Sequence, residues 1–97
     1  MTGWQAPEGF AIVRTIGPFD RESLPRGLLA QHRLKPDRWG HVRLSQGSVT
    51  MVWDDGTGRV DQLTAPAELI VPPQVMHHLE FADDFRLEIT FLERAAA

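Results

Sequence analysis

A double proline between two apolar segments constrains the fold of this chain more than any other feature. Pro72 and Pro73 each fix φ and lack a backbone N–H, so a regular strand cannot continue through them. The flanking segments 67–71 and 75–81 are apolar or alternating, which predicts two strands joined by a rigid corner. Such a corner can place the side chain of His77 at the mouth of a β-barrel, where it is a candidate for a functional site.

The composition limits the class of protein. The chain has 97 residues, of which 42% are hydrophobic, and we expect one domain over 1–97 with its core at about 10–92. The formal charge is −3, and the 10 Lys and Arg residues are scattered singly, so we expect neither nucleic acid nor membrane as a partner. The chain has no cysteine, so a metal would be held by nitrogen and oxygen. Without a leader-like start or a segment that could span a bilayer, a cytoplasmic location is expected.

Turn signals divide the rest of the chain into short strands. Alternating and β-branched residues predict further strands at 10–16, 28–34, 39–45, 48–53, 59–63 and 85–92. Gly17-Pro18 is expected to end the first of these strands, and the Asp-Gly sequence within 54–58 predicts a hairpin turn. About seven to nine short strands without a long helix predict an all-β sandwich or jelly roll.

Three histidines are candidates for a metal site. His32 shares the apolar face of the predicted strand 28–34, and His77 lies on a second apolar stripe. A single histidine on such a face is more often a hydrogen-bonded core residue than a ligand, but here there are two, on separate strands. His41 lies off the apolar face of its own strand, although a bulge at the neighbouring glycine could redirect it toward a shared site as a third ligand.

Other conspicuous side chains have simpler interpretations. His78 and Glu80 alternate with His77 and are therefore expected to face solvent. Trp39 stands beside His41 and is the best aromatic candidate for stacking on a ligand, although such residues most simply form the core or its rim. The sequence shows no Ser-His-Asp grouping, phosphate-binding glycine loop or thiol, so nothing supports a hydrolase or a nucleotide-binding protein.

Several spaced motifs together resemble a known family. They are His32-Arg33-Leu34-Lys35, Trp39-Gly40-His41-Val42, Gln46-Gly47, and Pro72-Pro73-Gln74-Val75-Met76-His77 with Glu80. From Val13 to Phe91 the chain is similar to the small single-domain cupins of the TehB/YeaR-like family, which includes a domain fused to the methyltransferase of some tellurite-resistance proteins. The resemblance implies a cupin-like jelly-roll β-barrel with a divalent metal ion at its mouth.

The resemblance also assigns roles to individual residues. His77 matches the histidine of the second cupin motif, and His32 matches the histidine that precedes the Trp-Gly strand in this family. Gly40 stands where the first cupin motif has a glutamate, so the usual carboxylate ligand is missing. Gln74 replaces the usual glycine of the second motif; we therefore expect a less tightly turned loop before His77, and we regard Gln74 as a candidate ligand-binding residue.

Three functions remain open. The first is a binder of a small molecule or oxyanion, in which His32 and His77 hold Zn²⁺, Fe²⁺, Ni²⁺ or Mn²⁺; the resemblance suggests a stress response to tellurite or nitrite. The second is a metal-dependent, dioxygenase-like enzyme acting on a small organic substrate, which we rank below binding because the glutamate is absent. The third is a metal-free barrel that pairs into a homodimer through an apolar edge.

Overall fold

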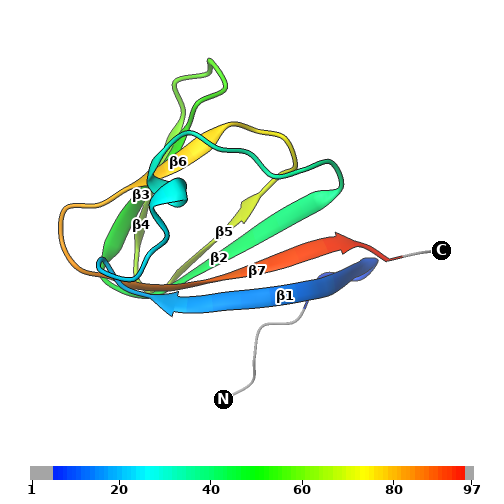
Figure 1. Ribbon diagram of the computed structural model, residues 1–97, viewed down its shortest axis with the longest axis horizontal. Helices are drawn as coiled ribbons and strands as arrows, with labels where there is room; N and C mark the ends of the chain where they lie inside the picture. Colours follow the sequence, from blue (N-terminus) through cyan, green and yellow to red (C-terminus); the bar gives the residue numbers. More distant parts are fainter. Residues whose placement is uncertain (1–5, 96–97) are drawn as a thin grey trace.

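The structure, a computed structural model, describes residues 6–95, which form two antiparallel sheets (Figure 1). The elements in chain order are β1 (Phe10–Phe19), a 3₁₀ helix η1 (Arg26–Leu29), β2 (Arg38–Gln46), β3 (Ser48–Trp53), β4 (Val60–Thr64), β5 (Ala67–Val71), β6 (His77–Glu80) and β7 (Arg86–Arg94). The larger sheet has the strand order β1-β7-β2-β5, and the smaller sheet has the order β4-β3-β6. The predicted all-β, cupin-like jelly roll is confirmed.

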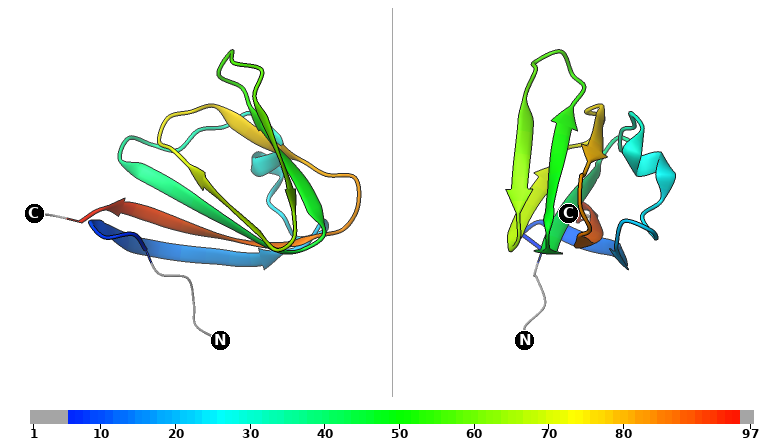
Figure 2. Two further views of the ribbon diagram at one scale, coloured as in Figure 1. Left: turned by 180° about the vertical axis from the view of Figure 1, so that it is seen from behind. Right: turned by 90° about the vertical axis from the view of Figure 1, so that its left-hand side faces the viewer.

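The two sheets face each other and enclose the core. Their strands converge at the end that contains the β2–β3 turn, and they diverge toward the end where β5 leads into β6 (Figure 2). Alternate residues point inward because successive side chains of a strand lie on opposite faces. The buried apolar residues are Leu24, Val42, Leu44, Val49, Met51, Trp53, Leu63, Val71, Leu79, Phe85, Leu87, Ile89 and Leu92. Burying one such leucine fully is worth about 1.5–3 kcal/mol.

The β2–β3 turn closes the narrow end of the barrel. Gly47 in this turn has φ +78°, in the left-handed region that side chains rarely adopt. A Cβ atom added here would overlap the carbonyl oxygen of Asp84 and lie 2.9 Å from Cα of Phe85. The turn therefore packs backbone against backbone on the β6–β7 loop, which requires glycine.

Most predicted strands are confirmed, and β3 and β5 have the predicted bounds. The hairpin turn between β3 and β4 is also confirmed, with positive φ at Gly56 and Gly58. β1 does not end at Gly17-Pro18 as predicted. It continues to Phe19 because a register shift against β7 between Ile16 and Phe19 absorbs the irregular segment.

The predicted strand at 28–34 is wrong. Its first two residues, Leu28 and Leu29, belong to η1, and the remainder makes one isolated bridge, between His32 and His77. Leu28, His32 and Leu34 are half-buried and the residues between them are exposed, so burial alternates like that of a strand only from Gln31 to Leu34, and this segment joins no sheet. No helix within residues 6–95 is long and apolar enough to cross a lipid bilayer.

Candidate functional site

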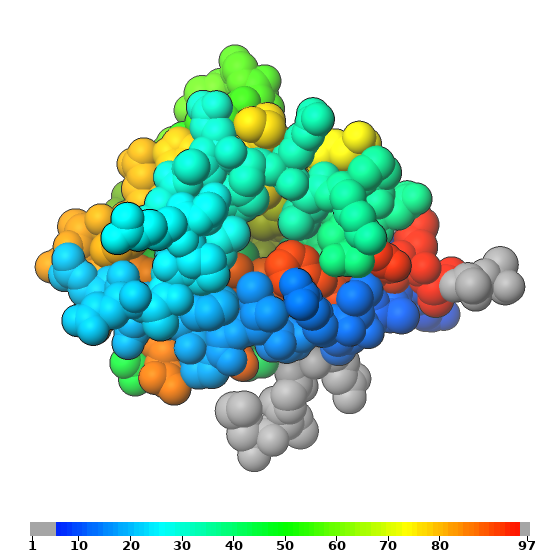
Figure 3. Space-filling view, in the orientation of Figure 1, coloured from blue at the N-terminus to red at the C-terminus, as the bar shows by residue number. Residues whose placement is uncertain are grey.

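A short strap closes the wide end of the barrel. We define the strap as residues 26–34; it lies on the face shown in Figure 3, where a hollow separates it from the residues that lead into β2. The backbone N–H of His32 donates to the carbonyl of His77, and the N–H of His77 donates to the carbonyl of His32, both at 2.9 Å. The N–H of Gln74 donates to the carbonyl of Leu34, also at 2.9 Å. These bonds fix the strap to the proline corner.

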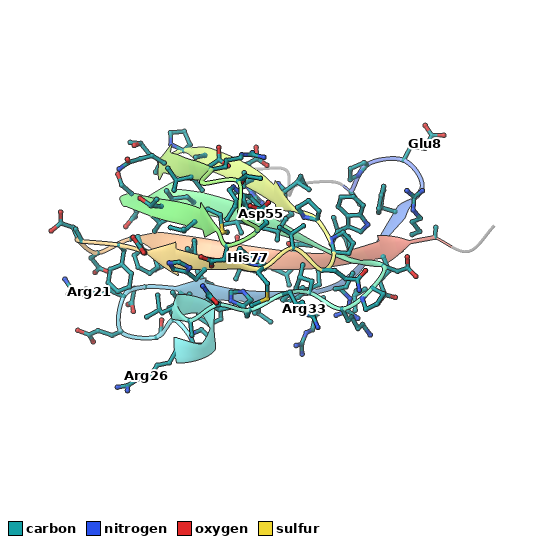
Figure 4. The ribbon with its side chains drawn as sticks, turned by 90° about the horizontal axis from the view of Figure 1, so that it is seen from above. Glu8, Arg21, Arg26, Arg33, Asp55 and His77 are labelled. Atoms are coloured by element: carbon teal, nitrogen blue, oxygen red, sulfur yellow. The ribbon has the colours of Figure 1, made fainter. Side chains whose placement is uncertain are left out.

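The strap brings His32 and His77 together. Their ring centroids are 4.2 Å apart, with an angle of 65° between the ring planes. His77 is only 3% exposed and lies near the centre of the molecule in Figure 4, whereas Arg26 and Arg33 of the strap point outward. The ring of Trp53 lies 5.8 Å from that of His77 and covers it from the side of β3.

Both imidazole rings are held in the same tautomer. Nδ1 of His32 lies 2.9 Å from the carbonyl oxygen of Ala30, and Nδ1 of His77 lies 2.7 Å from the carbonyl oxygen of Val75. Because a carbonyl oxygen only accepts, Nδ1 must be the donor in each ring. A neutral ring then carries its lone pair on Nε2. A carbonyl that orients the ring in this way is common behind metal-bound histidines.

The environment of His77 keeps its ring neutral. Burial lowers the pKa of His77 below its ordinary value of 6.5, and the neighbouring His32 lowers it further, against the opposing effect of the Val75 carbonyl. A neutral imidazole is the form that binds a metal ion. His77 therefore does not have to lose a proton near pH 7 before it can act as a ligand.

A small cavity adjoins the two rings. It has a volume of about 30 Å³ and is lined by Leu28, His32, Leu34, Gly40, Val42, Met51, Val71, His77, Leu79 and Ile89. Across residues 6–95, no group of three or more His, Cys, Asp or Glu side chains is arranged to hold a metal ion. Two imidazole nitrogens are half of a tetrahedral Zn²⁺ shell, so a metal ion here would need water or a ligand at its remaining positions.

The structure does not bring His41 or Trp39 to this pair. The register of β2 with β5 and β7 runs without interruption through Gly40, so the bulge that would redirect His41 is not formed. His41 consequently lies on the outer face of the larger sheet, where Nε2 donates to Oε1 of Glu68 at 2.9 Å. Burial lowers the pKa of His41, although Glu68 opposes the shift. Trp39 lies on the same outer face and packs edge-on against Phe10, with ring centroids 5.7 Å apart.

Gln74 supports the strap through its backbone. Its φ is +64°, so it adopts the left-handed conformation that glycine usually provides. The expected loosening of this loop is therefore wrong: the turn forms without glycine, and the Gln74 N–H bonds the strap. The side chain is exposed and does not line the cavity.

His78 lies on the face of β6 opposite to His77, as predicted. Its Nδ1 is 2.6 Å from Oδ2 of Asp54, and its Nε2 is 2.8 Å from Oε2 of Glu80. Carboxylates only accept, so each contact needs a donated N–H, and the imidazolium form of His78 can make both of them. The hydrogen bond with Asp54, followed by that with Glu80, raises the pKa of His78. The ring is therefore used in an ion-pair network and faces away from the cavity.

The sequence interpretation missed that Gly40 lines the cavity. Glycine inside an otherwise regular strand often marks a place where another group approaches closely, and this signal could have identified it. It also missed the strap, whose ends are marked by Pro25 and by the Lys35-Pro36 pair.

A family model described as the TehB-like domain matches residues 14–89. Among solved structures, TehB from Haemophilus influenzae superimposes with a TM-score of 0.81 at 18% identity, over 90% of this chain and 32% of that chain. A protein of Escherichia coli strain K12 superimposes with a TM-score of 0.84 at 18% identity, over 98% of this chain and 92% of that one. This chain thus spans about a third of TehB and nearly the whole of the second protein.

A cupin-2 domain containing protein from Shewanella frigidimarina is also similar, with a TM-score of 0.54 and 11% identity, over 94% of this chain and 76% of that chain. No curated protein matches the chain. The similarity to these solved structures shows the fold, and the family model covers most of the chain. The chain therefore belongs to the TehB-like domain family.

Proposed function

We propose that this domain binds a divalent metal ion through His32 and His77 and that the bound ion holds a small molecule or oxyanion. We further propose that the domain acts in the cytoplasm, in a stress response of the tellurite or nitrite type. The observation that carries the proposal is the shared tautomer of two neighbouring rings. In each ring the Nδ1–H donates to a backbone carbonyl, so the neutral ring carries its lone pair on Nε2. The centroids of the two rings are 4.2 Å apart. Zn²⁺, Fe²⁺ and Ni²⁺ suit imidazole ligands, and Mn²⁺ remains a further candidate. When bound, the ion would supply a Lewis acid that accepts an electron pair from the ligand.

The protein residues hold the site in place and exclude water from one side of it. The two-way backbone bridge fixes His32 against His77. Trp53 covers the second ring, and its indole N–H donates to Oδ2 of Asp61 at 2.7 Å, which fixes the position of the indole. Because these contacts are made within the protein, we expect the side chains to need little ordering when an ion binds.

Catalysis ranks below binding because the cavity has no acid or base other than the two histidines among the residues that line it. The carboxylates of Asp54 and Glu80 are hydrogen-bonded to His78 on the other face of β6.

Self-association of the domain is supported by a different observation. β1 is an edge strand of the larger sheet, and its Ile12 and Val13 side chains are 49% and 44% exposed. A homodimer through this edge is compatible with metal binding and also with a metal-free domain.

Elemental analysis of protein purified without chelator or metal affinity resin tests the proposal. We expect close to one metal ion per chain in the wild type and a large loss in His32→Ala and in His77→Ala. His78→Ala is the matched control, since it removes the neighbouring histidine of the same strand but leaves the cavity unchanged. His32 is only half-buried, so its variant is expected to fold, and circular dichroism checks this.

Metal-linked stability provides an independent readout. A ligand that binds only the folded state at 100 times its Kd stabilises it by about 2.7 kcal/mol, which raises the melting temperature of a domain of this size by roughly 10–20 °C. We expect this increase with added metal in the wild type and in His78→Ala, but not in His32→Ala. If the wild type remains free of metal after reconstitution and shows no such increase, the proposal is wrong.

A further inference from the structure

β1 is the longest edge strand of the molecule. The four edge strands are β1 and β5 in the larger sheet and β4 and β6 in the smaller one. β1 has 10 residues, whereas β4 and β5 have 5 each and β6 has 4. Within residues 6–95 no strand pairs with the outer edge of β1, which runs along the lower side of the molecule in Figure 1. A long unpaired edge is a template for pairing with another chain.

The other three edges are short, and two of them are protected. β5 lies between Pro66 and Pro72, which lack the backbone N–H that a ladder of hydrogen bonds requires. The far edge of β6 carries the bridge to His32 of the strap. In β4, Val60 is the one exposed large hydrophobic residue. β1 is therefore the edge with the most room for a partner strand.

The first half of β1 is apolar and uncovered. Residues 11–15 are all exposed, and within them Ile12 and Val13 are 49% and 44% exposed. A register shift against β7 between Ile12 and Arg14 leaves Val13 as an extra residue in β1. Pro18 prevents regular pairing of the second half. Adjacent exposed apolar side chains on an unpaired edge indicate a surface that another segment covers.

Two charges of opposite sign flank this apolar segment. Glu8 precedes it and Arg14 follows it, and neither makes an ion pair within residues 6–95. Arg14 is the only charged residue of β1, and its guanidinium carbon lies 5.7 Å from the centroid of the Phe91 ring. Glu8 points away from the molecule in Figure 4. The segment 8–14 therefore has a negative end, an apolar middle and a positive end.

This pattern is complementary to itself in an antiparallel pair. When a strand meets a second copy about a two-fold axis, each contact between two positions occurs twice. With the axis at Ala11, Phe10 faces Ile12 of the second copy, and Glu8 of each copy approaches Arg14 of the other. An axis at Arg14 would place like charges opposite each other, which is unfavourable in a sheet. Charge complementarity thus selects the axis at Ala11 and a second copy of this chain as the partner.

We propose that the domain forms a homodimer by antiparallel pairing of residues 8–14 with the same residues of a second copy, about a two-fold axis at Ala11. The larger sheets of the two copies then form one continuous sheet. This inference goes beyond the proposed function, because it assigns the surface, the symmetry and the contacting residues of an assembly. It does not depend on a metal ion at the histidine pair.

Sedimentation equilibrium of the full chain tests the association. We expect a monomer–dimer equilibrium in the wild type and a monomer in Ile12→Lys, because a lysine on an edge strand opposes pairing. Ile70→Lys is the matched control. Ile70 is 40% exposed on β5, the other edge of the same sheet, and its variant is expected to form the dimer like the wild type. Circular dichroism checks that both variants fold.

A charge swap tests the pairing of Glu8 with Arg14. Glu8→Arg and Arg14→Glu should each raise the Kd of the dimer at least about fivefold, because each ion pair occurs twice in a symmetric dimer and becomes repulsive. The double variant Glu8→Arg/Arg14→Glu restores opposite signs at the contact. Its Kd should be at least about fivefold lower than that of either single variant.

Disulfide formation tests the position of the axis. The chain has no cysteine, so Ala11→Cys introduces a single thiol. Facing residues in an antiparallel pair have Cβ atoms about 4.5–5.5 Å apart, and a disulfide needs about 3.5–4.5 Å, so a small adjustment suffices. Under mild oxidation Ala11→Cys should form a disulfide-linked dimer much faster than the control Val60→Cys, which places a thiol on the exposed edge strand β4.

Each of these experiments can overturn the proposal. A monomeric wild type, or a dimer that Ile70→Lys disrupts and Ile12→Lys does not, rules out the β1 interface. A double charge variant no tighter than the single variants, or equal rates of disulfide formation in Ala11→Cys and Val60→Cys, rules out the axis at Ala11. The metal content of Ile12→Lys tests the proposed function separately, since the substitution is not among the residues that line the cavity.

Discussion

Gly47→Ala should destabilise the protein far more than an ordinary glycine substitution. The first cost is conformational, because φ is +78° and a left-handed residue other than glycine costs about 1–2 kcal/mol. The second cost is steric. The new Cβ would overlap the Asp84 carbonyl oxygen and lie 2.9 Å from Cα of Phe85, and both are backbone atoms that cannot rotate away. Overpacking of this kind costs about 1–3 kcal/mol, so we expect a total of about 2–5 kcal/mol.

Gly56→Ala is the matched control for this experiment. Its φ is +86°, and an added Cβ would meet nothing within 4 Å, so it should show the conformational cost of about 1–2 kcal/mol alone. The free energy of unfolding is measured by urea titration with tryptophan fluorescence, and the two variants are compared at equal m-values. Equal losses in the two variants would refute the reasoning, because they would show that the β2–β3 turn does not pack against the β6–β7 loop as described.

Two further predictions concern the core and the ion-pair network. Leu87 is fully buried, and Leu87→Ala should lower the free energy of unfolding by about 2–5 kcal/mol in urea titrations; a loss below 1 kcal/mol would contradict its central place. Because Asp54 and Glu80 raise the pKa of His78 in the folded state, its stabilisation is complete below the ordinary value of 6.5 and declines as the pH rises through the raised pKa. Thermal unfolding of the wild type and of His78→Gln should therefore differ most below pH 6.5 and converge above the raised pKa, and a constant difference would exclude this linkage.

The alternation of apolar residues was sufficient to predict most of the sheet. β3 and β5 are bounded by turns and bury every second residue or nearly so, which makes their ends visible in the sequence. The same criterion, alternation of apolar residues, wrongly predicted a strand within the strap at 26–34. Its partial burial arises because one side of it covers the core, with Leu28 and Leu34 packed on the core and the residues between them mostly toward solvent. Periodicity records which side of a segment is covered, and it does not distinguish sheet pairing from a loop held over a core.

The histidine pair was predictable only in part. Periodicity correctly placed His77 inward and His78 outward on β6. The contact of His32 with His77 depends on the strap, whose path no local pattern reveals. Alternation alone also placed His41 away from the pair, and the bulge that was invoked to bring it back is absent from the register of β2. The failure came from adding an irregularity that the strand did not need.

Gly40 of β2 and Leu34 of the strap lie close together in the lining of the cavity beside the histidines. The resemblance to cupins described above places the glutamate of the first cupin motif at the position of Gly40, beside the two histidines. A Cβ atom at that position would lie 3.3 Å from Cδ1 of Leu34, so a longer side chain there requires the Leu34 side chain to move. The strap, however, is the element that carries His32 to His77. A carboxylate at position 40 would therefore compete for space with the Leu34 side chain of the strap, and any displacement of the strap that followed would also move His32.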